Sequence, residues 1–147
     1  MEGLTSGVAS ISAGTSQANS VGYLGCAVTT SGGAKCWGKN NYGQLGNGTT
    51  TDSPTPVDVS GLTSGVASID SSDDPDGNYT CAVTTSGGAT CWGLNQFGQL
   101  GDGTTEDRHS PVKVLDDGVI AVTTGSKHTL FLKEDGSVWA SGWNAYG

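Results

Sequence analysis

The stretch Cys26–Gly46, CAVTTSGGAKCWGKNNYGQLG, recurs almost unchanged as Cys81–Gly101, CAVTTSGGATCWGLNQFGQLG. Each copy contains a short β-prone run, a Ser-Gly-Gly turn, a second short run ending in Cys-Trp-Gly, and a glycine-rich loop. Two β-prone runs joined by a short glycine turn are typical of a β-hairpin. The two copies therefore predict two hairpins of the same shape.

The repeat extends beyond this stretch on both sides. Gly3–Ile11, GLTSGVASI, recurs unchanged as Gly61–Ile69, and a diverged third copy occupies 118–147. Four strands per repeat at this period are typical of a β-propeller blade. The four strands predicted for the first copy are Val8–Ile11, Cys26–Thr30, Ala34–Gly38 and Pro56–Val59.

These repeats predict an all-β fold of nearly three propeller blades, each with four antiparallel strands. The blades are expected at 1–60 and 61–115, with an incomplete third blade at 116–147. No useful length of sequence shows an apolar period near 3.6, so almost no helix is expected. Because closed propellers have about four to eight blades, we expect an open or partial ring. The chain is then either a piece of a longer protein or a subunit whose exposed blade edges are capped by other copies.

One connection varies in length between the copies. The distance between equivalent residues is 55 from Cys26 to Cys81 and 49 from Cys81 to Leu130, and the change arises just after the first strand of each copy. Length variation confined to one connection places it on a single face of the assembly, where binding residues are expected. The binding candidates in these loops are Thr15, Gln17, Asn19, Asp73 and Asp76.

The string Cys36–Gly46, its partner Cys91–Gly101, and the third copy's 128–144 resemble the regulator of chromosome condensation repeat family. The resemblance covers essentially the whole chain, and it implies a propeller that usually has seven blades. Members of the family have diverse functions, so the resemblance specifies the fold better than the function. Within the repeated loop we expect structural roles: Leu45 and Leu100 between blades, Tyr42 and Phe97 in aromatic packing, Gln44 and Gln99 bonded to loop backbone.

The cysteines form two pairs, Cys26 with Cys36 and Cys81 with Cys91, each spanning one predicted hairpin. Directly opposed positions on neighbouring strands are close enough for a disulfide. In the third copy both cysteines are missing together, which a covalent pair predicts. Free buried thiols are the alternative, and close Cys-x-x-Cys zinc knuckles are lacking. Disulfides indicate an oxidising compartment, so we expect an extracellular, cell-surface or periplasmic location.

One acidic loop is the only concentration of polar ligand atoms in the sequence. Calcium prefers six to eight hard oxygen ligands, and Asp-x-Asp-Gly-Asn resembles part of a calcium loop. The alternative is a solvated turn-rich insertion without a cofactor, since the completing glutamate is absent. Asn47 and Asn78 also begin glycosylation sequons. The calcium candidates are Asp70, Asp73, Asp74, Asp76 and Asn78.

Charge and composition exclude several classes of partner. The net charge is −8, with 6 basic and 14 acidic residues, and the basic residues are scattered. Nucleic-acid binding needs clustered Lys and Arg, so it is not expected. No apolar run reaches the length of a membrane span, so no membrane insertion is expected. The segment Met1–Thr5 does not resemble a signal peptide, so any export signal is expected outside this sequence.

These observations predict a non-catalytic exported module that binds a protein or a glycan at the cell surface. No nucleophile-elbow, phosphate-binding or metalloprotease motif is visible. His128 is expected to make a structural hydrogen bond, and His109 to be solvated. A self-assembling structural protein, built as a surface layer or filament, is the first alternative. A secreted enzyme inhibitor is the second, although the aromatic residues are expected mostly inside the blades.

Overall fold

The structure is a computed structural model that describes residues 4–14, 23–72 and 78–146. The described residues form eleven β-strands and no helix, and the strands are arranged in three antiparallel sheets. The first sheet has the order β1-β2-β3-β4, the second β5-β6-β7-β8, and the third β11-β10-β9. The strands of the first sheet are β1 (Val8–Ala13), β2 (Leu24–Thr29), β3 (Ala34–Gly38) and β4 (Ser53–Asp58).

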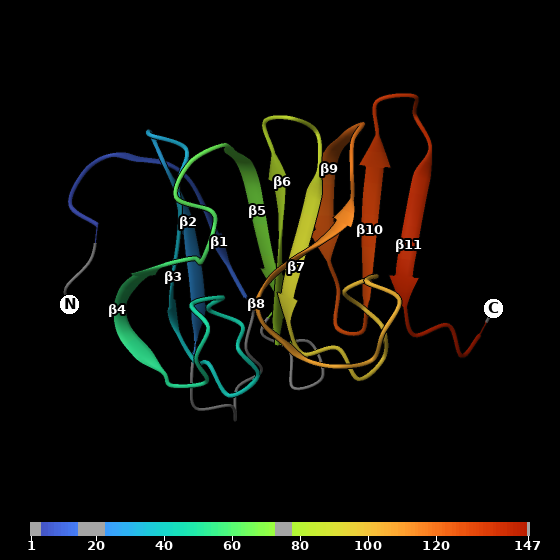
Figure 1. The fold of residues 1–147 in the computed structure, drawn as a ribbon, viewed down its shortest axis with the longest axis horizontal. Helices are drawn as coiled ribbons and strands as arrows, with labels where there is room; N and C mark the ends of the chain where they lie inside the picture. Colours follow the sequence, from blue (N-terminus) through green and yellow to red (C-terminus); the bar gives the residue numbers. More distant parts are fainter. Residues whose placement is uncertain (1–3, 15–22, 73–77, 147) are drawn as a thin grey trace.

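The second and third sheets repeat the same antiparallel order, and the three sheets stand side by side without closing a ring (Figure 1). This arrangement confirms the prediction of all-β propeller blades. The second sheet contains β5 (Val66–Ser72), β6 (Tyr79–Thr84), β7 (Ala89–Gly93) and β8 (Arg108–Leu115). The third contains β9 (Val119–Thr124), β10 (His128–Lys133) and β11 (Val138–Gly142).

The fourth strand of the first sheet lies earlier than predicted. It was expected at Pro56–Val59, whereas β4 covers Ser53–Asp58 and includes Pro54 as well as Pro56. Since β4 is an edge strand that pairs only with β3, its prolines do not remove a bond from the interior of the sheet. Val59 instead leaves the strand and is fully buried in the core.

The sheets pack face to face through a repeated contact. We call the side of a sheet that points toward the next sheet its downstream face, and the opposite side its upstream face. On the first sheet the downstream face presents Leu24, Cys26 and Val28, which pack in one cluster with Ala82 and Trp92 of the second sheet. The downstream face of the second sheet packs in the same way against Val119 and Phe131 of the third, in a cluster that also contains Tyr79, Cys81, Val83, Ala89 and Cys91.

The first strands of the three sheets are also linked directly. The Asp70 carboxylate on β5 accepts a hydrogen bond from the Ser12 hydroxyl on β1 at 3.2 Å. Its other oxygen accepts bonds from the Thr124 backbone N–H (2.7 Å) and hydroxyl (3.0 Å) on β9. One carboxylate therefore connects all three sheets along the edge formed by β1, β5 and β9.

Candidate binding surface

The strands run between two ends of the molecule that differ in their connections (Figure 1). The turn end carries the tight hairpin turns at 30–33, 85–88 and 134–137. The loop end carries the longer connections 39–52 and 94–107 and the segment 143–146. Strands β1 and β5 finish at the loop end and β2 and β6 start there, so the variable connections leave and re-enter the sheets at this end.

The residues predicted to bind in those variable connections lie outside the described residues. They are the candidates in the connection between β1 and β2 and three aspartates in the connection between β5 and β6. The residues concerned are Thr15, Gln17, Asn19, Asp73, Asp74 and Asp76.

The repeated loops at the loop end are built around a buried asparagine. The Asn40 side-chain carbonyl accepts a bond from the Leu45 N–H at 2.9 Å, and its amide donates to the Thr49 and Thr51 carbonyls. Asn95 does the same in the second loop, accepting from the Leu100 N–H at 3.0 Å. These asparagines lie within the string that resembles the family, but no role was predicted for them from the sequence. Their position three residues before the Gly-Gln-Leu-Gly motif in both copies is the signal that could have found them.

The predicted roles of Leu45, Leu100, Gln44 and Gln99 in these loops are confirmed. Leu45 and Leu100 are fully buried and belong to the clusters between sheets. The Gln44 side-chain oxygen accepts a hydrogen bond from the Tyr42 N–H at 2.9 Å. The Gln99 side chain accepts the matching bond from the Phe97 N–H at 2.9 Å.

The backbone carbonyls of these glutamines join each loop to the next sheet. The Gln44 carbonyl accepts bonds from the Trp92 indole N–H (2.9 Å) and the Thr80 hydroxyl (3.0 Å). Gly46 adopts a positive φ of 69° beside this contact, and a Cβ there would lie 2.6 Å from Trp92 Nε1. Glycine is therefore required on both conformational and steric grounds.

A charged pair stabilises the second loop where the first has a neutral residue. Asp102 accepts hydrogen bonds from Arg108 Nε at 2.6 Å, Asn95 at 3.1 Å and the Thr104 hydroxyl at 2.8 Å. Burial alone would raise the pKa of Asp102, but these bonds together outweigh it and lower the pKa below its usual value of 3.8. Asn47 occupies the equivalent position and accepts from the Thr49 hydroxyl at 2.8 Å.

The two predicted calcium ligands within the described residues have different environments. Asp70 uses both carboxylate oxygens to connect neighbouring sheets, as described above. Asn78 is only 8 % exposed at the start of the second hairpin. Calcium binding by the acidic loop remains a prediction. Of the two glycosylation candidates, the half-buried Asn47 is the more accessible acceptor.

The disulfide pairing within each hairpin is confirmed. Cys26 lies directly opposite Cys36 in the β2–β3 register, and Cys81 opposite Cys91 in β6–β7. Both pairs form disulfides with a Cα–Cα distance of 4.1 Å. All four residues are fully buried, on the downstream faces of the first two sheets. In the third sheet the opposed residues are Leu130 and Ala140, as the sequence alignment of the copies predicted.

Aromatic residues gather at the loop end near the third sheet. Trp143 lies 6.4 Å from Phe97 and 5.8 Å from Tyr146 between ring centroids. The Lys127 ammonium lies 4.9 Å from both the Phe97 and Trp143 ring centroids, within cation–π range. Trp143 is 48 % exposed and Tyr146 95 % exposed. The expectation that the aromatic residues are mostly internal was therefore wrong for this cluster, because it joins loops of adjacent sheets rather than packing within one.

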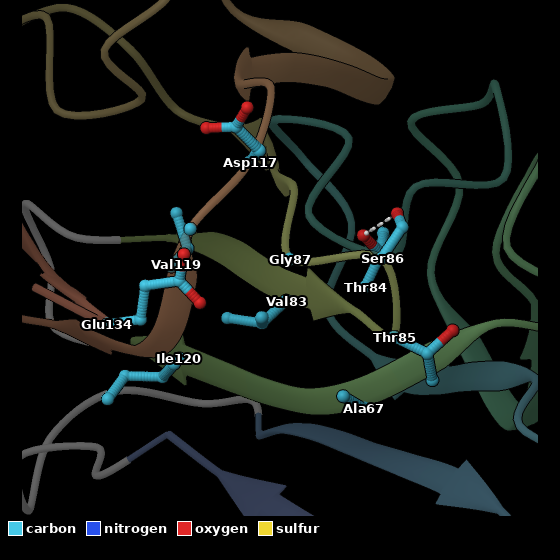
Figure 2. Close-up of a pocket in the computed structure, with 11 residues that line it drawn as sticks. Ala67, Val83, Thr84, Thr85, Ser86, Gly87, Asp117, Val119, Ile120 and Glu134 are labelled. Atoms are coloured by element: carbon cyan, nitrogen blue, oxygen red, sulfur yellow. Dashed lines mark hydrogen bonds between the residues drawn. The ribbon is translucent and has the colours of Figure 1, made fainter.

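A pocket opens at the opposite, turn end, between the second and third sheets (Figure 2). It encloses about 550 Å³. Its polar lining combines the hydroxyls of Thr84, Thr85 and Ser86 with the carboxylates of Asp117 and Glu134. Among the described residues no basic side chain lines it, although Lys133 Nζ lies 3.8 Å from the Asp117 carboxylate. The Thr84 and Ser86 hydroxyls are hydrogen-bonded to each other at 2.9 Å. Such a lining can bind a polyhydroxylated or cationic group.

The two histidines lie at the surface. His109 is exposed on β8, but its backbone carbonyl accepts a bond from the Gly48 N–H at 2.9 Å, so it also fixes the first loop. The backbone carbonyl of His128 accepts the Tyr79 hydroxyl proton at 2.6 Å.

The residues that the structure describes contain no group of three or more His, Cys, Asp or Glu side chains placed to hold a metal ion. They also contain no helix long and apolar enough to cross a membrane.

The repeated sheets, their matching loops and the contacts between them define a β-propeller repeat protein. The chain belongs to the regulator of chromosome condensation (RCC1) repeat family. Residues 32–74 and 86–132 match the RCC1 repeat, and residues 119–147 match a second description of the same repeat.

Similar proteins confirm the fold and are much longer than this chain. The mouse E3 ubiquitin-protein ligase HERC2 is 36 % identical over 79 % of this chain, which corresponds to 2 % of HERC2. The ultraviolet-B receptor UVR8 of Arabidopsis thaliana is 36 % identical over 76 % of this chain and 25 % of the receptor. This chain thus spans at most a quarter of these two relatives.

Solved structures show the same fold and are also longer than this chain. Human WBSCR16 superposes with a TM-score of 0.79 at 21 % identity, over 97 % of this chain and 35 % of that protein. Yeast Prp20, solved in a study that included its binding to Gsp1p and histones, superposes with a TM-score of 0.63 at 28 % identity, over 81 % of this chain and 28 % of Prp20.

Proposed function

We propose that this chain is a non-catalytic, exported β-propeller module that binds a protein partner through its loop end. The observation that carries the proposal is the exposed aromatic cluster at that end, formed by Phe97, Trp143 and Tyr146 around Lys127. Aromatic residues are enriched at the centres of protein interfaces. A related propeller, yeast Prp20, has been crystallised bound to the protein Kap60, which supports protein binding for the fold.

Export to an oxidising compartment is supported by the two hairpin disulfides. Disulfides persist in secreted and periplasmic proteins and are rare in the cytosol and nucleus. Non-reducing mass spectrometry of natively purified protein tests this part of the proposal. Both bridges should be found intact, and four unmodified thiols would contradict an extracellular or periplasmic location.

Binding at the loop end is tested by cross-linking oxidised protein to proteins of the cell surface and secreted fraction. The double variant Trp143→Ala/Tyr146→Ala should lose most of the cross-linked partner. The matched control is Trp139→Ala, since Trp139 is also an exposed aromatic residue (54 %) but lies on β11 away from the cluster. Equal loss of binding in both variants would contradict a specific role for the loop end.

A glycan is the second candidate ligand, favoured by the pocket at the turn end. Hydroxyl and carboxylate groups beside apolar side chains match the alternation of hydroxyl groups and C–H faces on a sugar ring. A glycan array probed with the oxidised chain tests this candidate. Ser86→Val should abolish any signal that comes from this pocket, whereas the loop-end variant should leave that signal unchanged.

A further inference from the structure

The third sheet exposes a face that the other two sheets bury. Its downstream face includes Leu132 and Val138, which are 37 % and 62 % exposed. The residues equivalent to Leu132 are Val28 and Val83, which are 3 % and 2 % exposed because the following sheet covers them. An apolar hollow of about 280 Å³ lies on this face, lined by Ala121, Thr123, Leu130, Leu132 and Val138.

The first sheet exposes its upstream face, which is the face that the second and third sheets each pack against the sheet before them. Ile11 on its upstream face is 76 % exposed, whereas the equivalent Ile69 is 8 % exposed and packs against the first sheet. Trp37 is partly exposed, whereas the equivalent Trp92 is fully buried and donates its indole N–H to the preceding loop. The chain therefore carries both halves of its own inter-sheet contact, one at each end.

We infer that these two faces bind each other between copies of this chain, head to tail. The downstream face of one copy's third sheet would receive the upstream face of another copy's first sheet. The contact continues an interface that occurs twice within the chain, between the first and second sheets and between the second and third. This inference goes beyond the proposed binding function and does not depend on it.

The symmetry of this contact follows from its geometry. Because two different faces meet, the contact is heterologous, and it closes into a ring only if the rotation between copies allows it. Each chain contributes three sheets, so two copies bring six together. Six lies within the range of about four to eight blades in closed propellers.

The association is expected to be reversible. The third sheet pairs three strands rather than four, so it offers a smaller face than the first two sheets do. Apolar area removed from water drives such contacts, and a smaller area gives weaker binding. The oligomer should therefore dissociate on dilution.

Sedimentation velocity over a dilution series of the oxidised chain tests the inference. The chain should associate at high concentration, and Ile11→Lys and Val138→Lys should each abolish association. Both side chains are mostly exposed in the single chain, so neither variant should unfold it, which circular dichroism checks. Mixing the two variants should restore a 1:1 complex, because each variant keeps the face that the other has lost.

Ile120→Lys is the matched control. Ile120 is 58 % exposed but lines the turn-end pocket rather than either free face, so its variant should associate like the unmodified chain. The inference is overturned if the unmodified chain stays monomeric at every concentration. It is also overturned if the mixture of the two variants stays monomeric while the unmodified chain associates.

Discussion

Asp102 is the carboxylate that pairs with Arg108 in the second loop. Its pKa is below 3.8, so the stabilisation that the carboxylate gives is present above this pH and is lost as the pH falls through the folded-state value. Asp102→Asn copies Asn47 of the first loop and removes this pH dependence. We expect the free energy of unfolding to fall by about 1–2 kcal/mol at neutral pH, because charge-assisted bonds are lost.

Denaturant titrations at several pH values measure this effect. The difference between the unmodified chain and Asp102→Asn should shrink as the pH falls below 3.8 and should vanish once the pH has passed the lower pKa of the folded-state carboxyl group. Asn47→Asp is the control, since Ser53 occupies the position equivalent to Arg108 and offers no guanidinium to the new carboxylate. A difference that does not change with pH would contradict the assigned role.

Tyr79 gives a second residue-scale prediction, at alkaline pH. Burial raises the pKa of Tyr79 to about 12. The unfolded chain ionises this tyrosine near pH 10, so stability is complete below pH 10 and is lost as the pH rises toward 12. Tyr79→Phe should lose less stability than the unmodified chain over this range, as measured by denaturant titration at each pH. Tyr23→Phe, at a position that is 76 % exposed, should behave like the unmodified chain.

At the scale of single elements, the hairpins test what the disulfides contribute. The third sheet shows that Leu and Ala can replace an opposed cysteine pair, so Cys81→Leu/Cys91→Ala should still fold. Each bridge closes a sequence separation of 10, and the chain-entropy model then gives about 2–3 kcal/mol per bridge. The variant should unfold at lower denaturant by about this amount under oxidising conditions. With full reduction the two proteins should converge, and a gap that persists would show that packing rather than the bridge is responsible.

The hairpins were also the elements that sequence could predict. The pairing of two neighbouring strands is determined locally, by the alternation of apolar and polar residues, the Ser-Gly-Gly turn and the matching distances of the two cysteines from it. Cys26 and Cys36 lie in the expected register. The predicted bounds of the fourth strand were wrong because an edge strand that contains two prolines shows little alternation of apolar and polar residues. The bonds of Asn40 and the Phe97–Trp143 cluster could not be predicted, since they join residues that become neighbours only after loops fold and sheets pack.

At the scale of the whole molecule, the stacked sheets predict an order of local opening. The second sheet is covered on both faces, whereas the third has one face exposed and a free edge at β11. Amide groups of β6 should exchange with solvent most slowly and those of β11 fastest, because opening β11 exposes little further apolar surface. Hydrogen exchange followed by mass spectrometry measures this directly. Equal protection of the two strands would mean that the sheets open as one unit, or that β11 is covered in solution.

The burial of the disulfides has a consequence for the order of events during biosynthesis. Cys26 and Cys36 are fully buried between the first and second sheets, and Cys81 and Cys91 between the second and third. An oxidant or an isomerase can reach each sulfur pair only while the next repeat is still undocked. If the sheets packed together in a reducing environment, the four thiols would therefore be buried before they were oxidised. Later transfer to an oxidising environment would not form the disulfides unless the sheets separated again.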